Sequence, residues 1–99
     1  MHARSKTFRL APEKIADATS EFERDHLPQY RNQTGYKGFT LLRKRDSGEV
    51  TGISYWESES DRAASDELGR TAGQQMLRTG GGEGEVAGDE WEVLLDDMA

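Results

Sequence analysis

The sequence predicts an α+β fold of the ferredoxin-like type, in which a β-α-β-β-α-β plait forms a four-stranded antiparallel sheet with two helices on one face. Three observations predict it. The 99 residues suit one domain, which we expect to span residues 1–99. A hairpin pattern occupies the middle of the chain. A segment with helical spacing and a segment with alternating side chains lie on each side of that hairpin.

The first strand is predicted over residues 3–10, where small side chains alternate with longer ones. Pro12 then suits the first position of a helix, where a missing N–H costs nothing. The helix carries a narrow stripe at helical spacing, formed by Ile15, Thr19, Phe22 and His26. Pro28 is expected to kink or end it near residues 25–27, and Gly35 to stop any second short turn.

The hairpin is predicted from residues 36–45 and 49–56, which flank the short polar loop "DSG". Its second strand ends with two large aromatic residues, Tyr55 and Trp56. Because neighbouring side chains of a strand point to opposite faces, one of them should pack under the helices and the other should lie on the far face.

The second helix is predicted over residues 59–78, because Ser58 and Asp61 form a capping pattern. Gly69 and Gly73 weaken this helix. Residues 79–85 are expected to form a flexible, glycine-rich loop, which lacks the Lys–Ser/Thr ending of a phosphate-binding loop. The last strand is predicted over residues 89–96.

Apolar residues are scarce, since Leu, Ile, Val and Phe together number sixteen of 99. This is below the roughly 20% at which a charged chain begins to resemble a disordered one. The predicted plait also leaves one face of its sheet uncovered. We therefore expect a homodimer in which a second subunit covers that face.

Composition excludes several classes of function. There is no cysteine, so thiol catalysis, disulfides and thiolate metal sites are excluded, and a cytoplasmic location is expected. A net charge of −6 argues against nucleic-acid binding, and no apolar run is long enough for a membrane span. Two distant histidines do not form a metal site. Residues 1–50 carry a net charge of +3 and residues 51–99 a net charge of −9. This asymmetry indicates either a solvated surface, which we favour, or an acidic last strand beside a basic first strand.

Small residues alternate along two strands that the plait makes neighbours: Ala3, Ser5 and Thr7 on one, Gly52 and Ser54 on the other. If these small faces coincide, they leave a hollow rimmed by Trp56, suited to a small ligand. The alternative is that Gly52 and Ser54 merely let a helix or a subunit approach closely.

The segments "HLPQYRNQTGYKGF" and "SYWESESD", in this order, resemble the antibiotic-biosynthesis-monooxygenase family. The resemblance covers residues 2 to about 70 and returns weakly at the last strand. It implies a dimeric α+β barrel made of two ferredoxin-like plaits. It also implies a possible oxygenase of small aromatic compounds (a phenol, a quinol or a polyketide) that uses no metal or flavin cofactor.

The candidate site residues follow from the resemblance and from their chemistry. Trp56 matches a tryptophan that lines the pocket in several members, although a tryptophan at a strand end is also often plain packing. Ser54, Tyr55 and Tyr36 are further substrate-binding candidates. Arg4 is the candidate for holding an oxyanion.

His26 or Tyr30, one helical turn apart, is the candidate for taking or relaying a proton. For His26 the alternative is a half-buried side chain bonded to nearby backbone. Two functions stay open: a cofactor-independent monooxygenase, and a non-catalytic dimeric barrel that binds a small apolar ligand or a protein partner.

Overall fold

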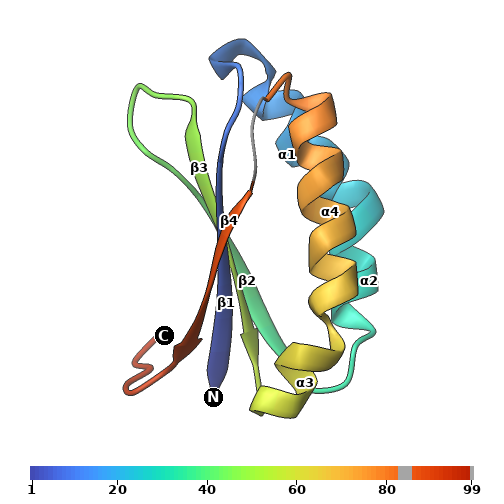
Figure 1. The fold of residues 1–99 in the computed structure, drawn as a ribbon, viewed down its shortest axis with the longest axis vertical. Helices are drawn as coiled ribbons and strands as arrows, with labels where there is room; N and C mark the ends of the chain where they lie inside the picture. The colour runs from blue at the N-terminus through green and yellow to red at the C-terminus, as the bar shows by residue number, and fades with distance from the viewer. Residues whose placement is uncertain (83–85, 99) are drawn as a thin grey trace.

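The computed structural model describes residues 1–82 and 86–98. Its sheet has the strand order β2-β3-β1-β4 and is antiparallel throughout. The helices all lie on one face (Figure 1), which confirms the predicted ferredoxin-like plait. The elements are β1 (His2–Arg9), η1 (Pro12–Lys14), α1 (Ile15–Glu21), η2 (Phe22–His26), α2 (Leu27–Arg31), β2 (Tyr36–Arg43), β3 (Glu49–Trp56), α3 (Glu59–Ala64), α4 (Asp66–Thr79) and β4 (Ala87–Glu92).

The regular first helix is interrupted just before Pro28, as predicted. After a 3-10 turn, η1, the chain runs as α1, then as the π-helical segment η2, and then as α2. The Leu27 N–H donates to the Phe22 carbonyl, five residues back, at the end of the π segment. Because Pro28 has no N–H, it cannot continue the usual helical ladder. The chain accommodates it with the wider turn of η2 and then continues as the short helix α2.

The second helical segment is two helices, not the single helix predicted over residues 59–78. Ser58 caps α3 as expected, accepting a hydrogen bond from the Asp61 N–H at 3.1 Å. The break lies at Ser65, whose hydroxyl donates to the Arg62 carbonyl at 2.7 Å. Such a local bond competes with the helical ladder and favours a turn.

The last strand ends earlier than predicted, at Glu92. Among the described residues, its only partner strand is β1, which begins at His2. The Val93 N–H still donates to the Met1 carbonyl at 2.9 Å, but Met1 is the first residue of the chain, and the strand pairing described for β4 ends at Glu92. Leu94 and Leu95 are therefore exposed and outside the sheet.

The glycine-rich segment predicted over residues 79–85 is anchored in its first part. Thr79 is the last residue of α4. The Gly80 carbonyl accepts from the Ala11 N–H at 2.9 Å, and the Gly82 N–H donates to the Leu77 carbonyl at 2.8 Å. Residues 83–85, on which the rest of this prediction falls, lie outside the described residues.

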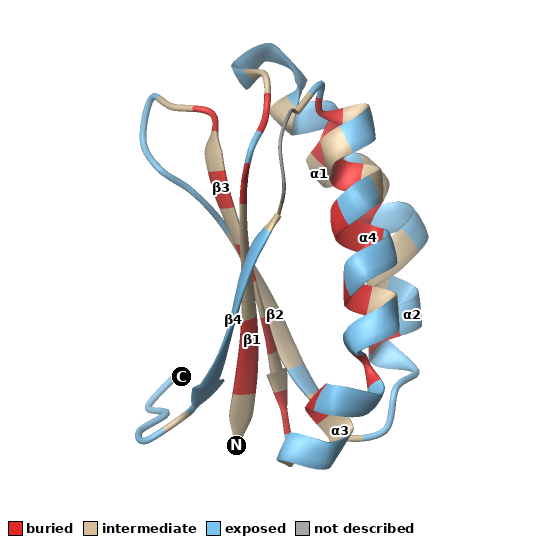
Figure 2. Cartoon of the chain, viewed as in Figure 1, coloured by how far each residue is buried: buried red, intermediate tan, exposed pale blue. Residues whose placement is uncertain are grey.

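The core lies between the sheet and the helices, where the buried residues gather (Figure 2). The register pairs Arg4 with Ser54 and Lys6 with Gly52, so these residues share the helix-facing side. We expected the small residues of the two strands to lie on the same face and to leave a hollow there, and this expectation was wrong. The small residues of β1 lie on the opposite face from Gly52 and Ser54. The residues buried in the core are Phe8, Leu10, Ala18, Phe22, Tyr30, Val50, Trp56, Ala72 and Met76.

In the part of the chain that the structure describes, no helix lies over the other face of the sheet (Figure 1). A groove of about 390 Å³ runs along it, and its walls include Ile53, Tyr55 and Val93. Trp91 lies on this face with 55% of its surface exposed, and its indole N–H donates to the Ser5 hydroxyl at 2.8 Å. Within residues 1–82 and 86–98, no helix is long and apolar enough to cross a membrane.

Candidate functional site

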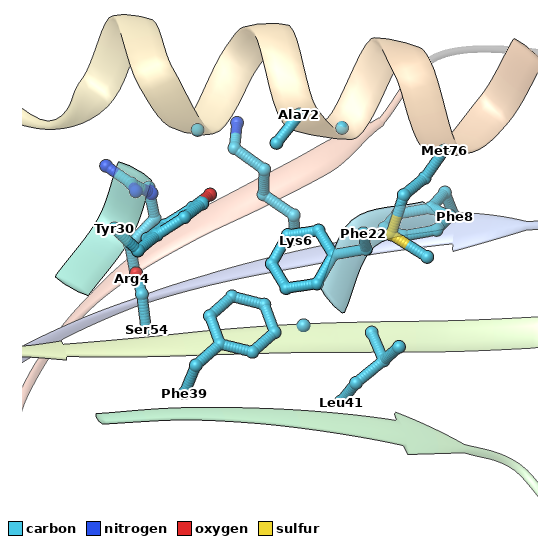
Figure 3. Close-up of a pocket in the computed structure, with 13 residues that line it drawn as sticks. Arg4, Lys6, Phe8, Phe22, Tyr30, Phe39, Leu41, Ser54, Ala72 and Met76 are labelled. Carbon is cyan, nitrogen blue, oxygen red and sulfur yellow. The ribbon is translucent and has the colours of Figure 1, made fainter. Parts of the chain in front are cut away.

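A small cavity lies between the sheet and the helices (Figure 3). Its volume is about 20 Å³, which is room for one water molecule. Most of its walls are apolar, and four polar side chains reach it. The cavity is lined by Arg4, Lys6, Phe8, Phe22, Tyr30, Phe39, Leu41, Gly52, Ser54, Gly69, Ala72, Gly73 and Met76.

Small residues on α4 make room at the roof of this cavity. Gly69, Ala72 and Gly73 follow helical spacing and face the sheet. A Cβ at Gly69 would lie 2.7 Å from the Arg4 guanidinium, too close for two side chains to coexist without a shift. The absence of a side chain at Gly69 is thus what allows Arg4 to lie beneath this helix.

Arg4 is the central polar group of the cavity, and only 6% of its surface is exposed. Its Nη1 donates to the Ser65 hydroxyl at 2.8 Å and to Asp66 Oδ1 at 2.8 Å, with a longer bond of 3.4 Å to the Arg62 carbonyl. Its Nη2 is buried and has no hydrogen-bond partner among the described residues. A buried donor without a partner is costly, so this atom is a candidate for bonding a ligand.

Asp66 links Arg4 to a second buried arginine. Asp66 Oδ1 also accepts from Arg62 Nη1 at 3.0 Å, and Arg62 Nη1 lies 3.1 Å from Glu90 Oε1 on β4. The acidic last strand therefore lies beside the basic first strand, which is the alternative that the charge distribution left open. This network fixes Nη1 of Arg4 and leaves its Nη2 available.

Tyr30 lines the same cavity and is 3% exposed. Burial raises the pKa of its hydroxyl above the usual value of 10.0. Arg4 counteracts part of this effect, through its positive charge and as a hydrogen-bond donor near the hydroxyl, although the two groups do not meet the geometry of a hydrogen bond. Tyr30 thus stays protonated at neutral pH. It can donate a hydrogen bond or relay a proton, but it is not a strong base.

Lys6 is the second cation of the cavity. Burial lowers the pKa of its ammonium group below the usual value of 10.5, and the neighbouring charge of Arg4 lowers it further. Lys6 and Arg4 also border a groove of about 280 Å³ that opens between α4 and β4. The groove is lined otherwise by Asp66, Arg70, Gly88, Asp89 and Glu90.

Three of the seven candidate residues reach the cavity: Arg4, Tyr30 and Ser54. Trp56 does not line it. Its ring is completely buried behind the wall, 6.3 Å from the Tyr30 ring, and its indole N–H donates to the Ser54 hydroxyl at 2.9 Å. Tyr36 packs edge-on against Trp56 at 5.8 Å and is likewise outside the cavity.

The structure places the other two candidates away from the cavity. Tyr55 follows the alternation of β3 and lines the groove on the open face, so it cannot share a site with Ser54 within one subunit. His26 packs against Phe22, with ring centroids 6.0 Å apart, and is not among the lining residues. Within the described chain its ring forms no hydrogen bond, so the expected bond to backbone is not present either.

The sequence reasoning missed Lys6 and the roof of small residues on α4. The alternation of β1 already puts Lys6 on the same face of the strand as Arg4. Gly69 and Gly73 were interpreted only as residues that weaken the helix, although they are four positions apart and therefore share one face of it. Their spacing was the signal that the helix approaches the sheet closely. In residues 1–82 and 86–98, no three histidine, aspartate or glutamate side chains converge as metal ligands do.

No protein-family model matches the sequence, and no curated protein matches it either. Solved structures do match. The ActVA-Orf6 monooxygenase of Streptomyces coelicolor, in complex with nanaomycin D, superposes with a TM-score of 0.78 at 15% identity, over 99% of this chain and 91% of that one. SnoaB of Streptomyces nogalater, a cofactor-independent oxygenase, superposes with a TM-score of 0.72 at 18% identity, over 96% of this chain and 94% of that one.

A protein of unknown function from Nitrosomonas europaea gives a TM-score of 0.69 at 17% identity over 99% of this chain and 93% of that one. At identities this low, the likeness concerns the fold. A structure described as an antibiotic biosynthesis monooxygenase from Nitrosomonas europaea likewise superposes with a TM-score of 0.70 at 15% identity, over 96% of this chain and 100% of that one. The chain therefore has the fold of the antibiotic-biosynthesis monooxygenases.

Proposed function

We propose that this protein is a cofactor-independent monooxygenase that acts on a small aromatic compound, such as a phenol, a quinol or a polyketide. The observation that carries the proposal is the buried Arg4 Nη2, which has no partner among the described residues and lies beside Tyr30 in an otherwise apolar cavity. Two solved proteins with this fold are a monooxygenase and a cofactor-independent oxygenase.

The reaction needs no external reductant. A phenol with a free para position and one O₂ give the para-quinone and one water, so the substrate supplies all the electrons. Loss of the phenolic proton makes the ring a better electron donor, and a positive charge beside the oxygen favours that loss. Arg4 is placed for this role. Tyr30 donates a hydrogen bond to the O₂ that is reduced. One oxygen atom becomes the new carbonyl on the para carbon, and the other leaves as water with the phenolic proton and the hydrogen of the para carbon.

An aromatic substrate needs more room than the 20 Å³ of the cavity itself. The groove of about 280 Å³ begins at the same two residues, Arg4 and Lys6. We place the substrate where the cavity and the groove meet, with its ring against the apolar walls. Trp56 and Tyr36 then support the site from behind and do not stack on the ring.

Oxygen consumption by the purified protein tests the proposal, with a panel of anthrones, quinols and naphthols. Arg4→Gln should lower the rate about 100-fold, the usual loss when one donor to an oxyanion is removed. Arg9→Gln is the matched control, because Arg9 ends the same strand with 70% of its side chain exposed. No oxygen uptake with any member of the panel would refute the proposal.

The second candidate is a non-catalytic barrel that binds a small apolar ligand or a protein partner. It is favoured by the mostly apolar cavity walls and by the absence of His26 from them. Native mass spectrometry of protein purified from its host distinguishes the two candidates. A retained ligand that is released unchanged in air supports this second function.

We also propose a homodimer in which the open faces of two sheets pack together. The groove on that face, with Trp91 and Tyr55 in its walls, supplies the apolar surface. An apolar surface of this kind on a chain so poor in apolar residues is typical of a subunit interface.

A further inference from the structure

Lys6 stands between the buried cavity and the groove that opens between α4 and β4. Among the described residues, only Lys6 and Arg4 line both spaces. Figure 3 shows the Lys6 side chain extending from β1 toward α4, with Tyr30 on one side of it and Met76 on the other. The stem of Lys6 therefore takes up the middle of the cavity, which leaves only about 20 Å³ free.

The two residues that border both spaces are held very differently. Arg4 is fixed by hydrogen bonds of 2.8 Å to Ser65 and to Asp66. The ammonium group of Lys6 is half-buried, and within residues 1–82 and 86–98 no hydrogen bond or ion pair holds it. Because a lysine stem has four flexible carbons, Lys6 can change its position while Arg4 stays in place.

Lys6 has room to move toward β4 but not toward β3. Its partners in the sheet register are two glycines, Gly52 on β3 and Gly88 on β4. At Gly52 the place of a side chain is taken by Phe39, whose ring would lie 3.0 Å from an added Cβ. At Gly88 an added Cβ would meet only the Ser5 carbonyl oxygen at 3.5 Å and Lys6 Cγ at 4.0 Å, so the space over Gly88 is open.

The groove beyond Gly88 suits the ammonium group of Lys6. It measures about 280 Å³ and is lined by three carboxylates, those of Asp66, Asp89 and Glu90. Asp66 and Glu90 pair with arginines, so Asp89 is the carboxylate that offsets the charge of Lys6 there. A lysine that turns into the groove thus keeps its charge near an acidic group and near water.

We propose that Lys6 is a gate residue, whose stem closes the cavity and which admits a small aromatic compound by turning over Gly88 into the groove. With Lys6 turned aside, the cavity and the groove form one continuous space, and the ring of the compound takes the place of the lysine stem. Lys6 therefore determines which sizes of compound reach Tyr30. The inference rests on the proposed function only in that the cavity takes a ligand, and it holds equally for an enzyme and for a binding protein.

The test follows the entry of benzyl alcohol, a neutral compound with one aromatic ring that is not a phenol. Of the three methionines of the chain, Met76 lines the cavity, whereas Met1 and Met98 lie at its two ends. In NMR spectra of protein with isotope-labelled methionine methyl groups, benzyl alcohol should shift the Met76 signal and leave the other two unchanged. The size of the shift during titration gives the affinity, and the line width gives the rate of exchange.

The first pair of variants removes or keeps the lysine stem. If the open state of the gate is about 10% populated or less, Lys6→Ala should bind benzyl alcohol at least about tenfold more tightly, because no closed state competes. Lys6→Met is the matched comparison, since its apolar stem of similar length stays in the cavity. Equal affinity of these two variants would overturn the inference.

The second pair tests the route and leaves Lys6 and the cavity unaltered. Gly88→Val fills the space over β4 into which Lys6 turns, and it should slow the exchange of benzyl alcohol about tenfold or more, as overpacking of the open state predicts. Ala87→Val is the control, because the neighbouring side chain of the same strand points to the opposite face. Equal exchange rates in Gly88→Val and Ala87→Val would refute the route.

An unshifted Met76 signal in all four variants and in the unaltered protein would refute the inference as a whole. If Gly88→Val does not fold, the comparison of Lys6→Ala with Lys6→Met still decides whether Lys6 is a gate. Entry of benzyl alcohol through the gate, together with no oxygen uptake from the panel of anthrones, quinols and naphthols, would reject the monooxygenase and keep the inference.

Discussion

Arg4 and Asp66 form an ion pair that fixes the polar end of the cavity. The two residues are 62 positions apart in the chain, and Arg4 Nη1 lies 2.8 Å from Asp66 Oδ1. The pair joins the first strand to the start of α4. Because Nη1 is held in this way, the orientation of the guanidinium is set, and its buried Nη2 has no hydrogen-bond partner among the described residues.

Asp66→Asn should loosen Arg4 without unfolding the protein. The amide keeps one acceptor but loses the charge that Arg4 and Arg62 share. Because half of the Asp66 side chain is exposed, we expect a loss of about 1–2 kcal/mol in the free energy of unfolding, measured by urea denaturation. Oxygen uptake should fall through kcat more than through KM. An unchanged kcat would show that Asp66 does not position Arg4.

Gly69→Ala should destabilise the protein, although alanine is the better helix former. The new Cβ would lie 2.7 Å from the Arg4 guanidinium, which its hydrogen bonds to Ser65 and Asp66 hold in place. We expect a loss of about 1–3 kcal/mol, as for other overpacked sites.

Gly73→Ala is the matched control on the same helix. Its Cβ would meet Lys6 and Val86 at 3.6 Å or more, which is ordinary contact. This variant should gain up to about 1 kcal/mol from helix propensity. Thermal unfolding of the two variants side by side checks the prediction, and equal melting temperatures would contradict it.

Stability should fall above pH 10 because of Tyr30. Burial raises the pKa of its hydroxyl above 10.0, and burial does the same at Tyr36. As the pH rises, the tyrosines of the unfolded chain lose their protons before those of the folded chain. Their contribution to the free energy of unfolding is therefore complete below the unfolded pKa, near 10, and is lost as the pH rises through the folded pKa. Urea denaturation from pH 9 upward measures the decline. Tyr30→Phe should make it shallower, and an unaltered slope would argue against the prediction.

The open face of the sheet should bring two copies together. Trp91 is 55% exposed on this face, and we expect the protein to sediment as a dimer at micromolar concentration. Trp91→Thr should raise the dissociation constant of the dimer at least about tenfold, because the substitution removes a large aromatic side chain from the interface. Gln74→Ala, on the exposed side of α4, is the control. A compact monomer of the unaltered protein would refute the dimer.

The sequence predicted much of the fold because its signals are local. Alternation identified β1 and the β2–β3 hairpin, and the Ser58 capping pattern located the start of α3. The predictions that failed depended on partners elsewhere in the chain. The end of β4 is set by where β1 begins, and the break at Ser65 accompanies bonds to Arg62 and Arg4.

By itself, the sequence determined the order of strands and helical segments, and it supplied seven candidate site residues. Only the tertiary structure decided which side chains meet. The pairing of β1 with β3 places Lys6 opposite Gly52, and this register connects residues more than 40 positions apart. No local pattern encodes such a register, because it is selected by how all four strands and the helices bury their apolar faces together.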